Sequence, residues 1–160
     1  LTLEEMAEHD AVIDVKLAAL GNPNIPTRVI HRMAAGTGKR VRETIAGNIS
    51  TPKTILMKSA RDRDTNVAYN VACNPNVPRE ALTILAERRN IGILVAVVRN
   101  KNTPEEALAK LARNNNRNLR LLIAEHENTS RETLEFLLLK AVKEADQKLA
   151  ETVRLALAKQ

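Results

Sequence analysis

The sequence is nearly devoid of aromatic residues, since Tyr69 and Phe136 are its only Phe, Tyr or Trp among 160 residues. A single large core normally relies on bulky aromatic side chains, so this composition favours thin repeated layers of Leu, Val, Ile and Ala. The shortage also argues against glycosylases that hold an extruded base and against sequence-specific readers of RNA, because both use aromatic side chains for stacking.

Cysteine and long apolar runs are also scarce. The single cysteine, Cys73, excludes an internal disulfide and a cysteine-based zinc site within the chain. Its apolar neighbours on a predicted helix indicate a buried, inert thiol. No apolar run approaches the ~20 residues that span a bilayer. We therefore expect a soluble protein with no membrane partner, and the cytoplasm is the default expectation for its localisation.

A short motif recurs along the chain at a fixed interval. Residues 74–78 (Asn-Pro-Asn-Val-Pro) show it best, and its last position recurs every 26 residues, at Pro26, Pro52, Pro78, Pro104 and Ser130. A constant period over five copies is typical of a repeat array. We predict an all-α fold, an α-solenoid superhelix of about five to six two-helix repeats, with a helix starting within two residues of each of these positions.

The period defines a single repeat domain over residues 1–160. The predicted parts are an N-terminal cap repeat (1–21), four full repeats (22–47, 48–73, 74–99 and 100–125) and a degenerate repeat with a C-terminal cap (126–160). In the first part, Leu3, Met6 and Ala7 predict one helical half. Asp10 is the expected N-cap of a second helix, and its apolar stripe would contain Val12, Val15, Ala19 and Leu20.

Residues 100–125 show the plan of one repeat. Thr103 is a predicted N-cap, Pro104 suits the first helical position, and Glu106 would complete a capping box. The first helix then presents a face of leucine and alanine, at Leu108, Leu111 and Ala112, at Leu82, Leu85 and Ala86, and at Leu134, Leu137 and Leu138.

A second short helix follows an inner turn. In residues 100–125 the turn is the run Asn114 to Asn116, and Leu119, Ile123 and Ala124 mark the helix after it. The next asparagine of each repeat is expected to end this helix in the left-handed C-cap conformation, at Asn22, Asn48, Asn74 and Asn100.

Together these positions resemble a known family. An apolar-Ala pair, then Asn-Pro-Asn-x-Pro, then x-x-x-Leu-x-x-Leu-Ala is similar to the leucine-rich repeat variant family, a HEAT-like all-helical solenoid. The resemblance covers roughly residues 22–138. It implies a right-handed superhelix of short paired helices and no enzymatic activity. The 26-residue period is slightly longer than the usual repeat, and there is no N-terminal cysteine cluster, so no cofactor is carried over.

The plan fades beyond Leu138. Lys140 to Lys148 contains no Gly, Pro or Asn, and residues 152–156 replace the turn motif. These features predict a capping helix, and periodicity leaves open whether residues 131–159 form one helix or two.

Candidate catalytic residues do not assemble into a pattern. Residues 36–40 (Gly-Thr-Gly-Lys-Arg) resemble part of a phosphate-binding loop, but the motif requires Gly where Met33 stands and Ser or Thr where Arg40 stands. His9, His31 and His126 occupy three different repeat positions, and no paired carboxylates are visible. We therefore expect a non-enzymatic protein.

Charge distinguishes the middle of the chain. Residues 22–125 contain 18 Lys or Arg and 8 Asp or Glu, and many of the cations fall in or beside the inner turns. Stacked repeats would place them along one edge at a spacing of ~8–10 Å, which suits a polyanion backbone, although solvated turns also favour Lys and Arg. The candidate polyanion-binding residues are Lys39, Arg40, Arg42, Arg61, Arg63, Arg88, Arg89, Arg113, Arg117 and Arg120.

A second candidate surface is apolar. Residues 91–98 have almost no polar face, so this helix is either covered by neighbouring repeats or presented to a protein partner or a second copy of the chain. The candidate partner contacts are Tyr69, Ile91, Leu94, Val95 and Leu121. The sequence thus predicts a binding or scaffold module with an unknown protein partner, and DNA or RNA backbone binding is the alternative.

Overall fold

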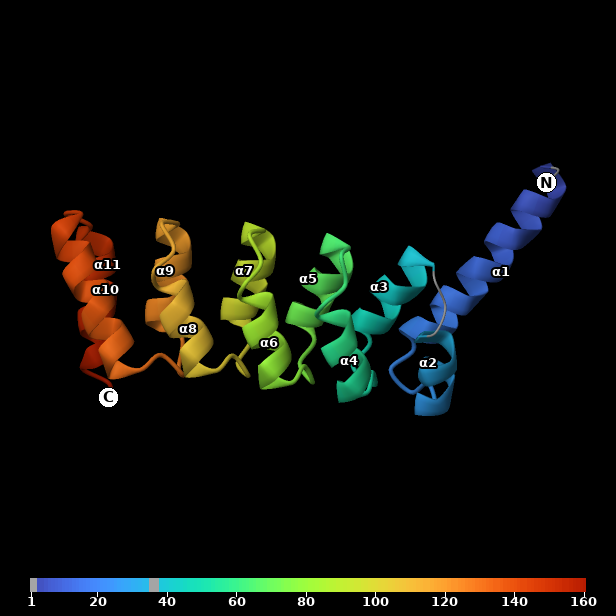
Figure 1. Cartoon of the computed structure of the whole chain (residues 1–160), viewed down its shortest axis with the longest axis horizontal. Helices are drawn as coiled ribbons and strands as arrows, with labels where there is room; N and C mark the ends of the chain where they lie inside the picture. The colour runs from blue at the N-terminus through green and yellow to red at the C-terminus, as the bar shows by residue number, and fades with distance from the viewer. Residues whose placement is uncertain (1–2, 35–37) are drawn as a thin grey trace. The chain divides into compact units, whose positions relative to one another are not determined.

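The computed structural model describes residues 3–34 and 38–160, with side chains from residue 12 onward within those ranges. These residues form α-helices joined by short turns and contain no β-strand (Figure 1), so the predicted all-α class is confirmed. In chain order the helices are α1 (Leu3–Gly21), α2 (Thr27–Ala34), α3 (Lys39–Gly47), α4 (Lys53–Ser59), α5 (Thr65–Cys73), α6 (Arg79–Leu85), α7 (Ile91–Arg99), α8 (Glu105–Leu111), α9 (Arg117–Glu125), α10 (Arg131–Lys143) and α11 (Gln147–Leu157). None of these described helices is both long and apolar enough to cross a membrane.

The first helix of each pair begins where the period predicts. Helices α2, α4, α6, α8 and α10 each start one residue after the recurring Pro or Ser position. The predicted capping box is wrong, however, because Pro104 itself is the N-cap of α8 and no side chain caps that helix. The hydroxyl of Thr103 is buried and donates instead to the carbonyl of Val97, at 2.5 Å. It therefore closes the turn that precedes the helix.

A polar residue before the second helix caps it in four pairs, whereas α3 begins after Gly38 with no side-chain cap. The Asp64 carboxylate accepts the backbone N–H groups of Asn66 and Val67 at the start of α5. Asn90 and Asn116 cap α7 and α9 in the same way. These side chains satisfy N–H groups that the first turn of a helix leaves without a partner, which fixes where these second helices begin.

The asparagine after each second helix has a role that the sequence did not predict. Asn48, Asn74 and Asn100 have φ angles of −75°, −70° and −80°, so the expected left-handed C-cap is wrong. Their backbone is extended and their side chains are buried. The amide of Asn74 donates to the carbonyls of Ala46 and Asn48, both at 2.9 Å, and its oxygen accepts the N–H of Asn76. One side chain thus joins two consecutive turns.

The same hydrogen bonds recur at other repeats. The Asn48 amide donates to the carbonyls of Leu20 and Asn22. His126 occupies this position later in the chain, where its Nδ1 accepts the N–H of Asn128 and its Nε2 lies 3.1 Å from the carbonyl of Asn100. Since Nδ1 accepts, Nε2 carries the hydrogen and donates it. A neutral histidine therefore replaces asparagine in this contact.

The first unit comprises residues 1–77. Helix α3 lies between α1 and α5, with α2 packed against α3 and α4 against both α3 and α5 (Figure 1). Buried Leu20, Ile30 and Ile45 form one core cluster. Cys73 is exposed, which corrects the expected buried thiol: it ends α5 on the side opposite its buried neighbours.

The predicted cap repeat differs most from the structure. Helix α1 runs without interruption through Asp10, the expected N-cap. Val12 and Val15 are 49% and 71% exposed, so only Leu20 of the predicted stripe is buried. No proline or glycine stands between residues 3 and 20, and one aspartate inside a helix lowers its stability by only a few tenths of a kcal/mol relative to ordinary residues.

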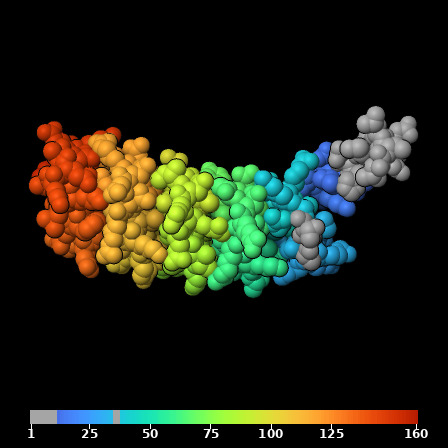
Figure 2. Space-filling view, turned by 45° about the horizontal axis from the view of Figure 1, so that its top comes forward, coloured from blue at the N-terminus to red at the C-terminus, as the bar shows by residue number. Residues whose placement is uncertain are grey.

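The second unit comprises residues 78–160. Helices α6 and α7, α8 and α9, and α10 and α11 form contacting pairs, and α9 also contacts α7 and α11. In the space-filling view these pairs form adjoining layers (Figure 2). Six of the seven leucines predicted to face the core are at most 3% exposed, whereas Leu138 is half-buried. The six are Leu82, Leu85, Leu108, Leu111, Leu134 and Leu137.

The end of the chain forms two helices. Helix α10 ends at Lys143 and α11 begins at Gln147, which answers the question that periodicity left open: residues 131–159 form two helices. Ala145 has a left-handed backbone, with φ of 55°, and the N–H of Asp146 donates to the carbonyl of Ala141. This is a Schellman motif with alanine at the position that usually holds glycine.

The Schellman motif gives a test of the backbone at residue 145. Ala145→Gly should raise the free energy of unfolding by about 1 kcal/mol, because glycine adopts a positive φ without the steric penalty that alanine incurs. Urea unfolding followed by circular dichroism measures the change. Ala158→Gly is the control, since Ala158 ends α11 with φ of −71° and should show no gain. Equal effects of the two substitutions would rule out the left-handed turn.

Candidate binding surfaces

Ion pairs hold five of the ten candidate polyanion-binding residues. The pairs are Lys39–Asp64 at 3.0 Å, Arg40–Asp14 at 3.3 Å, Arg42–Asp62 at 2.7 Å, Arg117–Asp146 at 2.6 Å and Arg120–Glu144 at 2.5 Å. All five join residues 20 or more apart in the sequence, so they connect neighbouring helical pairs. A cation held in this way must leave its carboxylate before it can contact a polyanion.

Arg120 does not belong to the candidate surface. Its side chain is only 4% exposed and donates to the Asn114 carbonyl as well as to Glu144. Among the described residues, its buried Nε has no hydrogen-bond partner. The residue faces inward because the turn before α11 places Glu144 over the start of α9, an arrangement that the repeat period did not predict.

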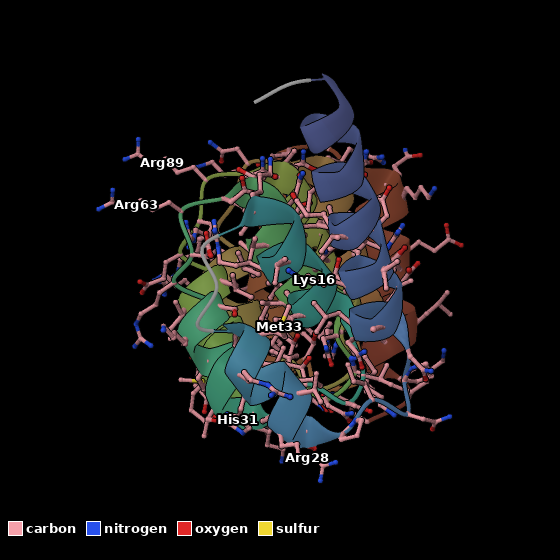
Figure 3. The ribbon with its side chains drawn as sticks, turned by 90° about the vertical axis from the view of Figure 1, so that its right-hand side faces the viewer. Lys16, Arg28, His31, Met33, Arg63 and Arg89 are labelled. Atoms are coloured by element: carbon pink, nitrogen blue, oxygen red, sulfur yellow. The ribbon has the colours of Figure 1, made fainter. Side chains whose placement is uncertain are left out.

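Four of the ten candidate residues, all of them arginines, remain exposed without an ion pair among the described residues. Arg61 and Arg63 follow α4 in the first unit, whereas Arg89 follows α6 and Arg113 follows α8 in the second. Arg63 and Arg89 each extend away from the helices into solvent (Figure 3). Arg88 is half-buried. The cations that remain available to a polyanion therefore lie in the turns after first helices, and they are fewer than the sequence predicted.

The ion pairs shift the pKa values of their carboxylates. Burial raises the pKa of Asp62, whereas the hydrogen bonds from Arg42 and from the backbone N–H of Asp64 lower it. The lowering is the larger effect, so the pKa of Asp62 is below its usual value. The Arg117 guanidinium, followed by the N–H of Leu149, lowers the pKa of Asp146. Both carboxylates are therefore ionised at neutral pH.

The lowered pKa of Asp146 predicts a pH dependence. Its stabilising contribution should be complete above the unfolded value of about 3.9 and disappear as the pH falls through the lower folded pKa. Asp146→Asn removes the charge and keeps a good N-cap for α11. The variant should be less stable than the parent at neutral pH, and urea midpoints should converge between about pH 5 and about pH 2.

Glu151→Gln is the matched control, because Glu151 is exposed on the same helix and forms no ion pair among the described residues. Its midpoints should follow those of the parent across the whole pH range. A constant difference between Asp146→Asn and the parent would exclude a contribution from the ionised pair.

The candidate partner contacts divide into buried and exposed side chains. Leu94 is 4% exposed and belongs to the core of the second unit, so its predicted surface role is wrong. It lies one helical turn before Val98, on the face of α7 that the neighbouring helices cover. In the first unit, Tyr69 is 45% exposed on α5.

The remaining three form an apolar strip in the second unit. Ile91 is 45% exposed at the start of α7, and Val95, one turn later, is half-buried. Leu121 occupies the matching position on α9, which contacts α7, and is also half-buried. We call Ile91, Val95 and Leu121 the α7–α9 strip.

The first unit contains a cavity that the sequence analysis did not predict. It has a volume of about 740 Å³ and lies among α2, α3, α4 and the turn after α4. Its lining residues are His31, Ala34, Arg42, Ile45, Ile55, Lys58, Ser59, Arg61, Asp62 and Arg63. The one signal that could have revealed it is Ser59, which stands where later repeats have leucine.

The residues that the sequence analysis rejected as catalytic candidates lie partly outside the described residues. Two residues of the glycine-containing segment, Gly36 and Thr37, lie outside the described residues, as does the side chain of His9. His31 is exposed on α2 (Figure 3), and His126 holds two backbone groups. Within the part of the chain that the structure describes, no three His, Cys, Asp or Glu side chains gather as metal ligands.

The chain matches no protein-family model, no curated protein and no solved structure.

Proposed function

We propose that this protein is a non-enzymatic binding module that contacts a protein partner. We further propose that its helical pairs form an α-solenoid of about five to six 26-residue repeats, similar to leucine-rich repeat variant proteins. The regular helix starts and the buried Asn and His side chains support this arrangement, because they join consecutive repeats within each unit. Side chains on such a scaffold are held in fixed positions, which favours binding.

The α7–α9 strip carries the proposal of a protein partner. Helix α7 is apolar around most of its circumference, yet the described helices cover only part of it, and Ile91 remains 45% exposed. A large branched side chain beside two half-buried ones forms an apolar patch that association would remove from water. A protein surface offers the apolar side chains needed for this contact, whereas a phosphate backbone does not.

The test replaces the strip by cationic side chains that retain an aliphatic stem. Ile91→Lys with Leu121→Lys should fold, because the stems cover the helix while the ammonium groups reach water. A displayed library of protein fragments is selected on the parent, and selected binders should lose at least about 100-fold in affinity for the double variant. Sedimentation equilibrium of the parent measures self-association, so it tests whether the partner is a second copy of the chain.

Leu139→Lys with Leu155→Lys is the matched control. Both leucines are more than half exposed, at 73% and 60%, and lie on α10 and α11 outside the strip. Binders should retain their affinity for this variant. If the parent selects no binder and does not self-associate, or if the two double variants bind equally, the strip is not a protein-binding surface.

Polyanion binding is the second candidate, favoured by the exposed arginines of the turns. Duplex DNA and single-stranded RNA are titrated against the parent at several salt concentrations. If Arg89 and Arg113 contact phosphates, Arg89→Glu with Arg113→Glu should weaken binding and flatten the slope of log affinity against log salt by about two units. A parent affinity weaker than about 10⁻⁴ M near physiological salt excludes this function.

A further inference from the structure

One lining residue of the cavity in the first unit departs from the repeat. Ser59 lies seven residues after Pro52, and the same position in later repeats holds Leu85, Leu111 and Leu137. Those leucines are at most 3% exposed, so each belongs to the packed core. The Ser59 side chain is smaller than leucine and fills less of the same position. It is half-buried and lines the cavity instead.

The floor of the cavity is apolar. Ala34 comes from α2, Ile45 from α3 and Ile55 from α4. Ile45 belongs to the buried core cluster, and Ala34 and Ile55 pack against it. An apolar side chain of about leucine size that entered here would contact the core from which a repeat leucine is missing, and would leave water as it did so.

The rim of the cavity is cationic. His31, Lys58, Arg61 and Arg63 are exposed and form no ion pair among the described residues. Asp62 is the one acidic residue in the described lining, and it accepts a hydrogen bond from Arg42 at 2.7 Å and another from the N–H of Asp64. Its charge is therefore balanced within the wall. Ligand carboxylates would face cations on α4 and in the turn after α4, with the His31 side chain of α2 beside them.

We propose that this cavity binds an acidic peptide segment of a partner protein through one leucine-sized apolar side chain. The apolar side chain takes the place of the missing repeat leucine, and Asp or Glu residues on either side of it contact the cationic rim. Cations from a helix and the turn after it suit several carboxylates along a chain better than a single anionic group. A nucleic acid has no apolar side chain for the floor, and the described lining offers no aromatic ring for a base. This site belongs to the first unit and is independent of the α7–α9 strip.

The experiment is an unbiased selection of random twelve-residue peptides displayed on phage against the whole parent chain. Enriched peptides should share one Leu, Ile or Met flanked by at least two Asp or Glu. Ser59→Leu restores the side chain of the other repeats, so it should raise Tm by a few degrees and weaken the best synthetic peptide at least about tenfold. Ser59→Ala is the control that leaves the cavity open, and it should bind as the parent does.

A surface variant tests the rim without touching the core. Arg61→Glu with Arg63→Glu should weaken the same peptide at least about tenfold, more strongly at low salt. Arg28→Glu with Lys53→Glu makes an equal charge change at exposed positions that do not line the cavity, and should have little effect. If Ser59→Leu does not unfold cooperatively, the rim variant and its control still test whether the peptide binds at the cavity.

Two results would overturn the proposal. One is a selection that enriches no acidic peptide with an apolar residue, whether or not a DNA duplex binds the parent in a separate titration. The other is an enriched peptide that binds Ser59→Leu and the rim variant as tightly as the parent. Neither result bears on the α7–α9 strip, because the Ile91→Lys with Leu121→Lys variant leaves the cavity unchanged.

Discussion

Replacing Asn74 by alanine should lower the free energy of unfolding by about 3–5 kcal/mol. The side chain is 1% exposed, and its amide donates to two backbone carbonyls, those of Ala46 and Asn48. Alanine leaves both carbonyls and the N–H of Asn76 without this partner in a site that water does not reach. Each such group costs about 1–3 kcal/mol. Asn74→Asp should be at least as harmful, because a carboxylate cannot donate to the carbonyls.

Asn76→Ala is the control for the loss of an asparagine two residues away. Asn76 is exposed and donates to the carbonyl of Ile49 at 2.6 Å, where water can replace it. Its removal should cost less than about 1 kcal/mol. Urea unfolding of the three variants and the parent measures the differences. Similar small losses for Asn74→Ala and Asn76→Ala would show that the buried asparagine does not hold the turns together.

Leu108→Ala should lower the free energy of unfolding by about 2–5 kcal/mol. Leu108 is fully buried on α8, so the variant loses both the burial of the side chain and the contacts around the space it leaves. Total stabilities of single domains are about 5–15 kcal/mol, so this change removes a large share. Leu139→Ala, at a 73% exposed position of α10, should change stability by less than about 0.5 kcal/mol. A loss below about 1 kcal/mol at Leu108 would mean that the leucine face is misassigned.

The sequence predicted the helices well because local signals repeat. Pro52, Pro78 and Pro104 fix the backbone just before a helix, and an apolar face follows each of them at the same spacing. Ser130 lacks that backbone constraint, yet α10 still begins at the next residue because its hydroxyl caps the helix. Five consistent copies reinforce a signal that one copy would leave weak.

Contacts between repeats could not be predicted in the same way. An asparagine after a helix suits a left-handed cap by local rules, and only the neighbouring turn, 26 residues earlier, supplies the carbonyls that hold Asn74 extended. Similarly, Arg120 is the buried residue of the predicted cation set. Its burial depends on Glu144, which comes from the turn before α11. Long-range partners decide both conformations.

The candidate surfaces were predicted only in part for the same reason. Periodicity placed Ile91, Leu94 and Val95 on one apolar helix, but burial depends on which neighbours cover each face, and Leu94 is covered while Ile91 is not. Turn composition identified the arginines, whereas their carboxylate partners come from neighbouring helical pairs. The cavity was missed because Ser59 looks like an ordinary polar surface residue until it is compared with Leu85 at the same repeat position.

Methyl NMR of the parent chain with a selected protein binder tests the α7–α9 strip most directly. Labelled methyl groups of Ile, Leu and Val report contacts without any substitution, so folding is not in question. The largest shifts on saturation should occur at Ile91, Val95 and Leu121, while the exposed methyls of Leu139 and Leu155 stay unchanged. Unchanged strip methyls in the presence of a saturating binder would contradict the proposal that this surface contacts a protein partner.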